Sequence, residues 1–268
     1  MSAARPSPPR PAAVLAAHGL TLRAGGRTLV GALEQRFAPG ECWCIAGPNG
    51  AGKTTLISAL AGLQSPAGGR IELDGRALGA WPARTLALRR ALMPQTLRDA
   101  FSASVFDTVL IGRLPHLAGW GWEQAQDRAA AHAALAALDL ETLAGRDVLS
   151  LSGGERQRVA LAAVLCQEAP LMLLDEPLAH LDLHHQIDAL RLLAARAAAG
   201  ATVIFSCHDL NLARRYASHA LLLDGAGGAL AGPAREVLSP AHASRAFGYP
   251  LVLIESGGRE ALVPGELS

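Results

Sequence analysis

The sequence lacks an apolar run long enough to span a membrane, and it has almost no excess charge of either sign. Its 268 residues include 24 Lys and Arg against 23 Asp and Glu, a formal net charge of +1. No global positive field favours nucleic acid, so we expect no nucleic-acid partner. A membrane-spanning helix needs about 20 predominantly apolar residues. Any membrane role should therefore come through a partner protein.

The sequence contains few cysteines, and its first residues do not have the pattern of a signal peptide. The four cysteines lie in apolar contexts whose spacing fits no zinc site: Cys42, Cys44, Cys166 and Cys207. This pattern predicts buried, reduced thiols in a reducing compartment. Residues 1–13 carry Pro and Arg without an apolar signal-peptide core, so we expect a disordered tail on a cytoplasmic protein.

What the sequence does contain is a glycine-rich loop that fits G-x-x-x-x-G-K-[ST]. The loop residues are Gly47, Pro48, Asn49, Gly50, Ala51, Gly52, Lys53, Thr54 and Thr55. An apolar run precedes the loop and a segment with helical spacing follows it, which is the strand–loop–helix context of a phosphate-binding loop. Backbone N–H groups can converge there on phosphate oxygens. Lys53 supplies a positive charge for the terminal phosphates, and the Thr54 hydroxyl is placed to bind Mg²⁺.

Alternation of strand and helix patterns predicts an α/β fold with a doubly wound sheet. The first part, 14–37, alternates around Gly25-Gly26 and predicts antiparallel strands. The continuous apolar runs 171–174 and 201–206 predict strands buried on both faces. Between them and the phosphate loop lies Ala/Leu-rich sequence typical of helices, which indicates a helical insertion into a parallel-sheet core.

Two acidic residues, Asp175 and Glu176, follow the apolar run 171–174 directly. Ligands of open α/β sheets bind at the carboxyl ends of the strands. Asp175 can hold the magnesium shell, while Glu176 can orient or deprotonate an attacking water. Upstream, Ser152 is followed three residues later by Glu155, the spacing of a helix-capping box.

These motifs, in this order, resemble those of the ATP-binding subunits of ABC transporters, from about Leu15 to about Val263. The resemblance implies a P-loop NTPase (RecA-like) core with a mainly parallel sheet. It also implies an N-terminal antiparallel β subdomain and an inserted α-helical subdomain at about 96–168, all within one ATP-binding domain over 14–264. The implied ligands are ATP and Mg²⁺.

The resemblance also implies roles for individual residues. Asp175 would be the Walker B aspartate and Glu176 the catalytic glutamate. Gln95 would sense and ligate magnesium, and His208 would be the switch histidine at the γ-phosphate. The residues that would contact nucleotide across a head-to-tail homodimer are Ser152, Gly153, Gly154 and Asp182.

Three further strings resemble importers of iron–siderophore complexes, haem and cobalamin: Gly112-Arg113 with Pro115-His116, residues 207–213, and residues 237–249. This branch implies an ATPase subunit at the cytoplasmic face of the inner membrane, bound to permease subunits and served indirectly by a solute-binding protein. A soluble ABC ATPase for cofactor assembly, without a permease, is the alternative. A catalytically silent nucleotide-binding regulator is disfavoured by the intact motif residues.

Three details remain open at this stage. Ala24 stands where many family members place an adenine-stacking aromatic residue, so Arg23 or Arg27 could supply that contact. His180, His184 and His185 cluster but lack an evident fourth ligand, so solvated side chains are favoured over a metal site. Segment 101–122 should dock the permease through Leu114, Leu117, Trp120 and Trp122, or else these residues cap the subdomain's own core.

Overall fold

The computed structural model describes residues 13–95, 102–117 and 121–266, and it arranges them around a six-stranded sheet. The order in this sheet is β10-β9-β3-β8-β7-β6, and all neighbours are parallel except β10. Its strands are β3 (Cys42–Ala46), β6 (Arg90–Met93), β7 (Leu171–Leu174), β8 (Thr202–Ser206), β9 (His219–Leu223) and β10 (Ala229–Pro233).

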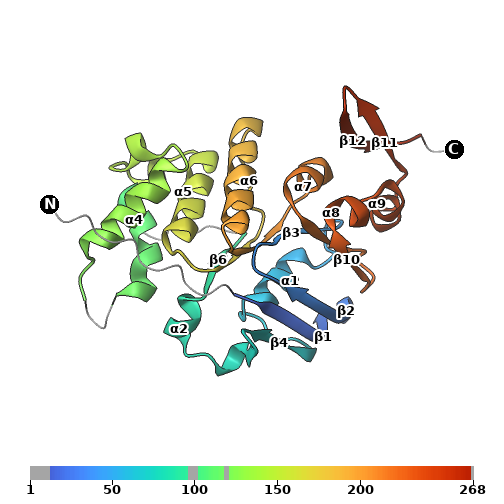
Figure 1. The fold of residues 1–268 in the computed structure, drawn as a ribbon, viewed down its shortest axis with the longest axis horizontal. Helices are drawn as coiled ribbons and strands as arrows, with labels where there is room; N and C mark the ends of the chain where they lie inside the picture. Colours follow the sequence, from blue (N-terminus) through green and yellow to red (C-terminus); the bar gives the residue numbers. More distant parts are fainter. Residues whose placement is uncertain (1–12, 96–101, 118–120, 267–268) are drawn as a thin grey trace.

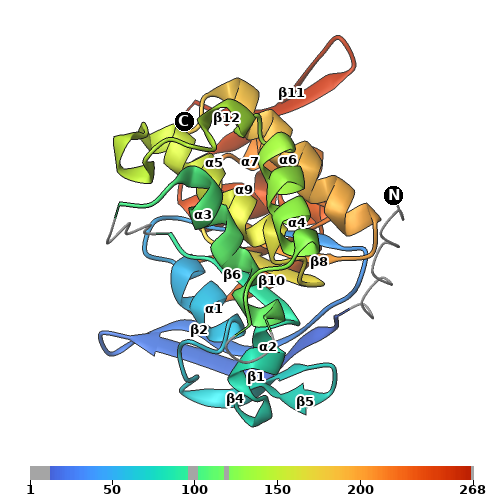
Figure 2. The ribbon, with the colours of Figure 1, turned by 90° about the vertical axis from the view of Figure 1, so that its left-hand side faces the viewer.

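A second, antiparallel sheet of order β2-β1-β4-β5 lies below helix α1 (Lys53–Leu60) in Figure 2. Its strands are β1 (Leu15–Ala24), β2 (Arg27–Phe37), β4 (Gly68–Leu73) and β5 (Arg76–Ala77). The six-stranded sheet and then most of the other helices lie above α1 (Figure 2). Strand β3 shows why the layers form: its residues are buried on both faces, with Cys44 in one core and Trp43 and Ile45 in the other.

Most of the other helices gather on the other side of the six-stranded sheet: α3 (Val105–Leu110), α4 (Ala125–Ala136), α5 (Gly153–Cys166), α6 (Leu183–Ala198), α7 (Leu210–Tyr216), α8 (Ala234–Val237) and α9 (Pro240–Phe247). Helix α2 (Ala83–Ala87) instead lies on the α1 side, where Leu86 packs against the core that contains Leu56 of α1. Short 3₁₀ turns add η1 (Leu78–Ala80), η2 (Ile111–His116), η3 (Glu141–Leu143) and η4 (Val148–Ser150). Figure 1 shows α4 and α5 at the end of the molecule away from β2 and β10.

The fold class predicted from the sequence is confirmed: a P-loop NTPase core, antiparallel N-terminal strands and inserted helices. Specific contacts set two of the helix ends. Helix α2 is confined to Ala83–Ala87, because Arg90 already pairs with Leu171 at the sheet edge. Helix α3 begins at Val105, since the Ser104 hydroxyl caps it by accepting from the Asp107 N–H at 3.0 Å.

The two chain ends also add to the expected picture. Ala13, the last residue of the expected tail, is buried, and its carbonyl accepts from the Thr202 hydroxyl at 2.6 Å. Residues 1–12 lie outside the described residues. A C-terminal hairpin of β11 (Leu251–Ser256) and β12 (Arg259–Pro264) was not predicted, although its Gly257-Gly258 turn has positive φ at both residues, a hairpin signal.

Arg113 joins three segments of the helical subdomain at a buried position. Its Nε donates to Asp127 Oδ1 at 2.9 Å, and its Nη1 donates to the Cys166 carbonyl at 2.9 Å and to Glu168 at 2.7 Å. Arg113 and Asp127 are 6% and 3% exposed. Burial opposes the charged forms, but the Gln124 N–H and Arg113 keep the pKa of Asp127 below its usual range. The guanidinium thus connects η2, α4 and the end of α5.

None of the helices in the described part of the chain is both long and apolar enough to cross a bilayer. All four cysteines are free and buried, as the sequence predicts. Burial raises the pKa of the Cys207 thiol to about 11 and that of Cys166 likewise to about 11. These thiols are therefore protonated at neutral pH and behave as small apolar side chains.

Candidate functional site

The phosphate-binding loop runs from the carboxyl end of β3 to the first residue of α1. Gly47 and Gly52 have φ of 148° and 103°, and both approach neighbours closely. A Cβ on Gly47 would lie 2.5 Å from the Leu223 carbonyl oxygen, and one on Gly52 would lie 2.9 Å from Leu29 Cβ. Only glycine fits at these positions. The loop therefore wraps tightly around the N-terminus of α1, whose N–H groups can receive an anion.

Lys53 is folded back onto this loop. Its Nζ donates to the carbonyls of Gly47 and Pro48 at 2.9 and 3.1 Å, and the residue is 6% exposed. Burial lowers the pKa of the ammonium group, while the carboxylates of Glu176 and Asp175 act in the opposite direction. The ammonium group thus lies between the loop and the two acidic residues. A terminal phosphate bound there can replace the two carbonyls as the hydrogen-bond partner of the Lys53 Nζ.

Asp175 and Glu176 follow β7 at the carboxyl edge of the sheet, beside the end of β6. Met93 lies opposite Leu174, and the Asp175 N–H donates to the Met93 carbonyl at 2.9 Å. The buried Asp175 carboxylate accepts from the Ser206 hydroxyl at 2.7 Å. That hydroxyl in turn accepts from the Glu176 N–H at 2.7 Å. Ser206 thereby fixes both acidic residues from the neighbouring strand β8.

Glu176 adopts a left-handed backbone conformation with φ of 50°. Its carboxylate Oε1 lies 2.8 Å from Nε2 of His208. Its backbone carbonyl accepts from Nε2 of the buried Gln157 at 2.8 Å. Such a conformation is uncommon for a residue with a side chain and persists only where its surroundings hold it. Here Ser206 and Gln157 hold the backbone, and the side chain is left directed at His208.

Oxygen donors suited to a divalent cation meet beside the phosphate loop. The Thr54 hydroxyl donates to Gln95 Oε1 at 3.3 Å, which places α1 and the residue after β6 in contact. Asp175 supplies a carboxylate at the same sheet edge. A hydroxyl, an amide oxygen and a carboxylate are hard donors of the kind Mg²⁺ takes, together with water and phosphate oxygens. The donor set therefore fits Mg²⁺.

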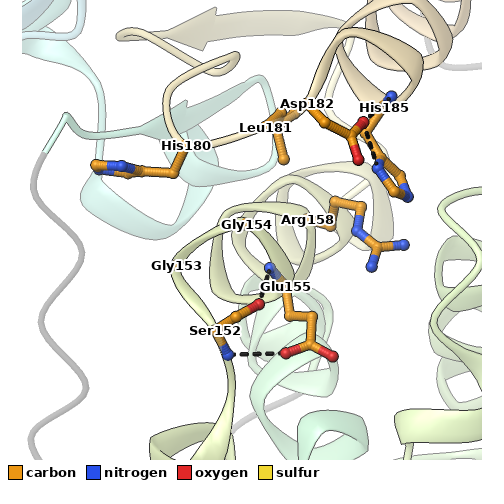
Figure 3. Close-up of a pocket in the computed structure, with 9 residues that line it drawn as sticks. All are labelled: Ser152, Gly153, Gly154, Glu155, Arg158, His180, Leu181, Asp182 and His185. Carbon is orange, nitrogen blue, oxygen red and sulfur yellow. Dashed lines mark hydrogen bonds and ion pairs between the residues drawn. The ribbon is translucent and has the colours of Figure 1, made fainter.

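The four residues predicted to contact nucleotide across a dimer, called the signature residues below, line a separate, open hollow of about 490 Å³ (Figure 3). It is lined by Ser152, Gly153, Gly154, Glu155, Arg158, His180, Leu181, Asp182 and His185. Ser152 caps α5: its hydroxyl accepts from the Glu155 N–H at 3.3 Å, and its own N–H donates to the Glu155 carboxylate at 2.7 Å. The capping box predicted from the sequence is confirmed.

Gly154 lets two loops of this hollow approach each other. A Cβ at Gly154 would lie 2.9 Å from the His180 carbonyl oxygen, so a larger residue would push the loop before α6 away. Asp182 caps α6 by accepting from the His185 N–H at 2.9 Å. The hollow's lining includes no residue of the phosphate loop 47–55. Within one chain, the signature and the phosphate loop are therefore two separate surfaces.

Two of the histidines near this hollow, His184 and His185, pair with acidic residues. His185 Nδ1 lies 2.8 Å from Asp182 Oδ1, and His184 Nε2 lies 3.3 Å from Asp188 Oδ2. Each thus has a carboxylate partner on its own helix or its cap. Among the described residues, no group of three or more His, Cys, Asp and Glu is arranged to hold a metal.

The β1–β2 turn reaches the phosphate loop through Arg27. Its Nη2 donates to the Gly225 carbonyl at 3.1 Å, and a Cβ built on Gly225 would lie 3.8 Å from both Ala51 and Pro48. Ala24 is exposed in the same turn, and Arg23 is exposed beside it. Arg23 and Arg27 are the two arginines that could replace the adenine-stacking aromatic residue. Of the two, Arg27 is bound to Gly225, whose segment lies against the phosphate loop.

Sequence reasoning missed two residues of this site. Ser206 ends an apolar strand, and a polar residue at that position is a signal that was available. Gln157 carries no local signal, because its partner Glu176 lies 19 positions further along the sequence and nothing near either residue points to the contact.

The sequence pattern that defines the ABC transporter family matches residues 31–179. The chain is 44% identical over 251 residues to the hemin import ATP-binding protein HmuV of Streptomyces coelicolor, a match that covers 92% of this chain and 89% of that protein. The chain belongs to the ABC transporter family. It is likewise 44% identical over 246 residues to HmuV of Pseudomonas entomophila, covering 90% of this chain and 94% of the relative.

Among solved structures, this ABC ATPase resembles a chain of an ABC transporter assigned to the metal-chelate type, in an inward-facing conformation. The TM-score is 0.81 at 29% identity, and the match covers 95% of this chain and 98% of the other. Membership of the family makes the chain an ATP-binding protein and an ATPase.

Proposed function

We propose that this chain is the ATP-hydrolysing subunit of a haem importer. It would work as a homodimer beneath a permease, at the cytoplasmic face of the inner membrane. The observation that carries the proposal is the convergence at one sheet edge of Lys53, Thr54, Gln95, Asp175 and Glu176. The hemin import names of the relatives support the choice of haem among the metal chelates.

In this proposal the phosphate loop and Lys53 bind the β- and γ-phosphates of ATP, because the loop's N–H groups and the ammonium face the same space. Thr54, Gln95 and Asp175 would hold Mg²⁺, which neutralises charge on the phosphate oxygens. Glu176 would orient or deprotonate the attacking water. His208, in contact with Glu176, would donate to the γ-phosphate.

The separate hollow in Figure 3 supports a site completed by a second copy. At the start of α5, Ser152 is exposed and Gly154 is half-buried. The N-terminus of that helix is directed at the hollow. A helix N-terminus favours an anion. In a head-to-tail dimer, these residues and Asp182 would close over ATP held by the partner's phosphate loop.

Haem as the cargo is tested with the chain in its natural membrane. Pull-down of this chain from detergent-solubilised membranes should bring an integral membrane protein with it. Proteoliposomes made from that complex, with ATP inside, should accumulate haem in an ATP-dependent way and should not accumulate cobalamin or a ferric siderophore. If no membrane protein accompanies an ATPase-active chain, the cofactor-assembly alternative replaces the importer. Transport of another chelate alone would correct the cargo.

The permease would dock on the exposed face that follows α3. Ile111 and Leu114 are 57% and 60% exposed, and Trp122 is 88% exposed. Trp122 therefore does not cap the subdomain's core. Leu117 is half-buried, while Phe101 and Trp120 lie outside the described residues. Exposed large apolar groups gathered in this way often mark an interface.

Leu114→Glu should therefore abolish haem transport while ATPase activity of the free subunit persists. A buried charge at the centre of an apolar interface costs several kcal/mol, enough to lower permease affinity by about 100-fold or more. Transport by proteoliposomes and phosphate release by the purified chain separate the two effects. Leu230→Glu is the matched control, since Leu230 is 39% exposed on β10, at the sheet edge opposite β6. Full transport by Leu114→Glu would remove this face from the docking surface.

A further inference from the structure

We propose that Asn211 is a positioning residue for His208, and that it acts by binding helix α7 to the C-terminal hairpin of β11 and β12. The inference rests on the role proposed above for His208. Figure 1 shows the hairpin beyond α9, with α7 beside it, and α7 and β12 are in contact. Leu262 of the hairpin thus contacts Asn211, which lies three positions after His208 in the sequence.

Asn211 pairs with the backbone of Leu262 as a strand would. Its Oδ1 accepts from the Leu262 N–H at 2.7 Å, and its Nδ2 donates to the Leu262 carbonyl at 3.1 Å. Both polar groups of the carboxamide are used, and only an amide offers a donor and an acceptor in this geometry. Leu262 itself is 6% exposed, so the contact is closed to solvent on the hairpin side.

An ion pair one turn further along α7 repeats the connection. Arg214 Nη2 lies 3.0 Å from Glu260 Oε2 on β12, and the arginine side chain is 9% exposed. Its Nη1 also donates to the carbonyls of Arg235 and Leu238, at 3.0 and 2.8 Å. Helix α7 has only seven residues, too few to be stable without such tertiary contacts. The hairpin and the end of α8 therefore hold it in place.

Helix α7 holds the chain after His208 through a cap, while the Cys207 N–H, which donates to the Ile45 carbonyl at 3.3 Å, holds the chain before it. The Asp209 carboxylate accepts from the N–H groups of Asn211 and Leu212 at 2.8 and 3.0 Å, so the backbone after His208 is fixed to the first turn of α7. The His208 side chain is 51% exposed. Because little packs around this ring, its distance to Glu176 depends on the backbone that carries it. Freeing Asn211 should let that backbone shift.

The test is a double-mutant cycle on ATP hydrolysis by the purified dimer. Asn211→Ala should lower kcat about 10-fold and leave KM for ATP within about twofold, since displacement of a reacting group by a fraction of an ångström lowers rate more than binding. In a His208→Ala background, Asn211→Ala should lower kcat no further, because there is no imidazole left to position. Arg259→Ala, which removes an exposed side chain from the same strand, is the control and should match the unmodified chain.

Asn211→Asp in the full-length chain provides the second variant, should Asn211→Ala fold poorly. It keeps an acceptor for the Leu262 N–H but loses the donor to the Leu262 carbonyl, so it should also lower kcat, and this loss should likewise disappear in the His208→Ala background. The inference is overturned if Asn211→Ala leaves kcat unchanged or lowers it equally with and without His208. It is also overturned if His208→Ala alone has no effect. Absence of ATP hydrolysis in the unmodified dimer would instead reject the proposed function.

Discussion

Glu176→Gln should lower ATP turnover by about 100-fold or more while ATP still binds. The substitution keeps the side chain's size and removes its charge and basicity, and loss of a general base typically costs about 10² to 10⁴ in rate. Backbone contacts from Ser206 and Gln157 hold this residue irrespective of its side chain, so the fold around it should not change. Phosphate release measures turnover, and equilibrium binding of ATP measures affinity.

The oligomeric state of the variant and a control substitution test this prediction further. Dimers trapped with nucleotide should accumulate on a sizing column, because hydrolysis would be the step that opens them. Glu141→Gln, a change at an exposed residue of η3, is the control and should hydrolyse ATP normally. Turnover at the normal rate by Glu176→Gln would show that another group orients the water. A loss of ATP binding instead would place Glu176 among the phosphate-binding residues.

Mixing two inactive variants, Lys53→Ala and Ser152→Arg, should restore ATP hydrolysis. If Ser152 completes the partner's site, each mixed dimer has one site with both lesions and one with neither. Random mixing should then return roughly a quarter of normal activity, provided one intact site can turn over. If Ser152 instead served its own chain's phosphate loop, every site would carry a lesion and mixing would restore nothing. Phosphate release before and after mixing distinguishes the two arrangements.

The Ser152→Arg chain needs its own stability check. The Ser152 hydroxyl caps α5, and loss of an N-cap costs about 0.5 to 2 kcal/mol. Ser152→Ala loses the same cap without adding bulk, so it is the matched control for stability. A thermal midpoint for Ser152→Arg close to that of Ser152→Ala, together with recovery on mixing, would show that the arginine blocks the partner's site rather than unfolding the chain.

Much of this fold was predictable because its signals are local. The phosphate loop, the capping box at Ser152 and the apolar run before Asp175 each fit within about ten neighbouring residues. The contacts that hold Glu176 are different: Ser206, Gln157 and His208 all come from other segments, and each residue type alone is unremarkable. Their assembly depends on strand order, which is set by the pairing of β7 with β8. The functional roles of these residues stay predictions.

The C-terminal hairpin escaped prediction for a related physical reason. Residues 251–254 are all apolar, so they show none of the alternation that marks a half-buried strand, and three of them are more than a third exposed: Val252, Leu253 and Ile254. Their pairing with β12 and the contact of Leu262 with Asn211 stabilise a strand that composition alone does not identify. Contacts between segments that are distant in the sequence, rather than the intrinsic β-propensity of the residues, decide this part of the structure.

Helix α5 and its hydrogen bond to Arg113 connect the signature residues directly to the face proposed for the permease. The helix has 14 residues, so it is about 21 Å long. Ser152 stands at one end, and at the other the Cys166 carbonyl is bound by the guanidinium of Arg113, the residue next to Leu114. If binding of nucleotide between two copies tilted α5 at Ser152, the hydrogen bond between the Cys166 carbonyl and Arg113 would couple that tilt to the segment that carries Leu114.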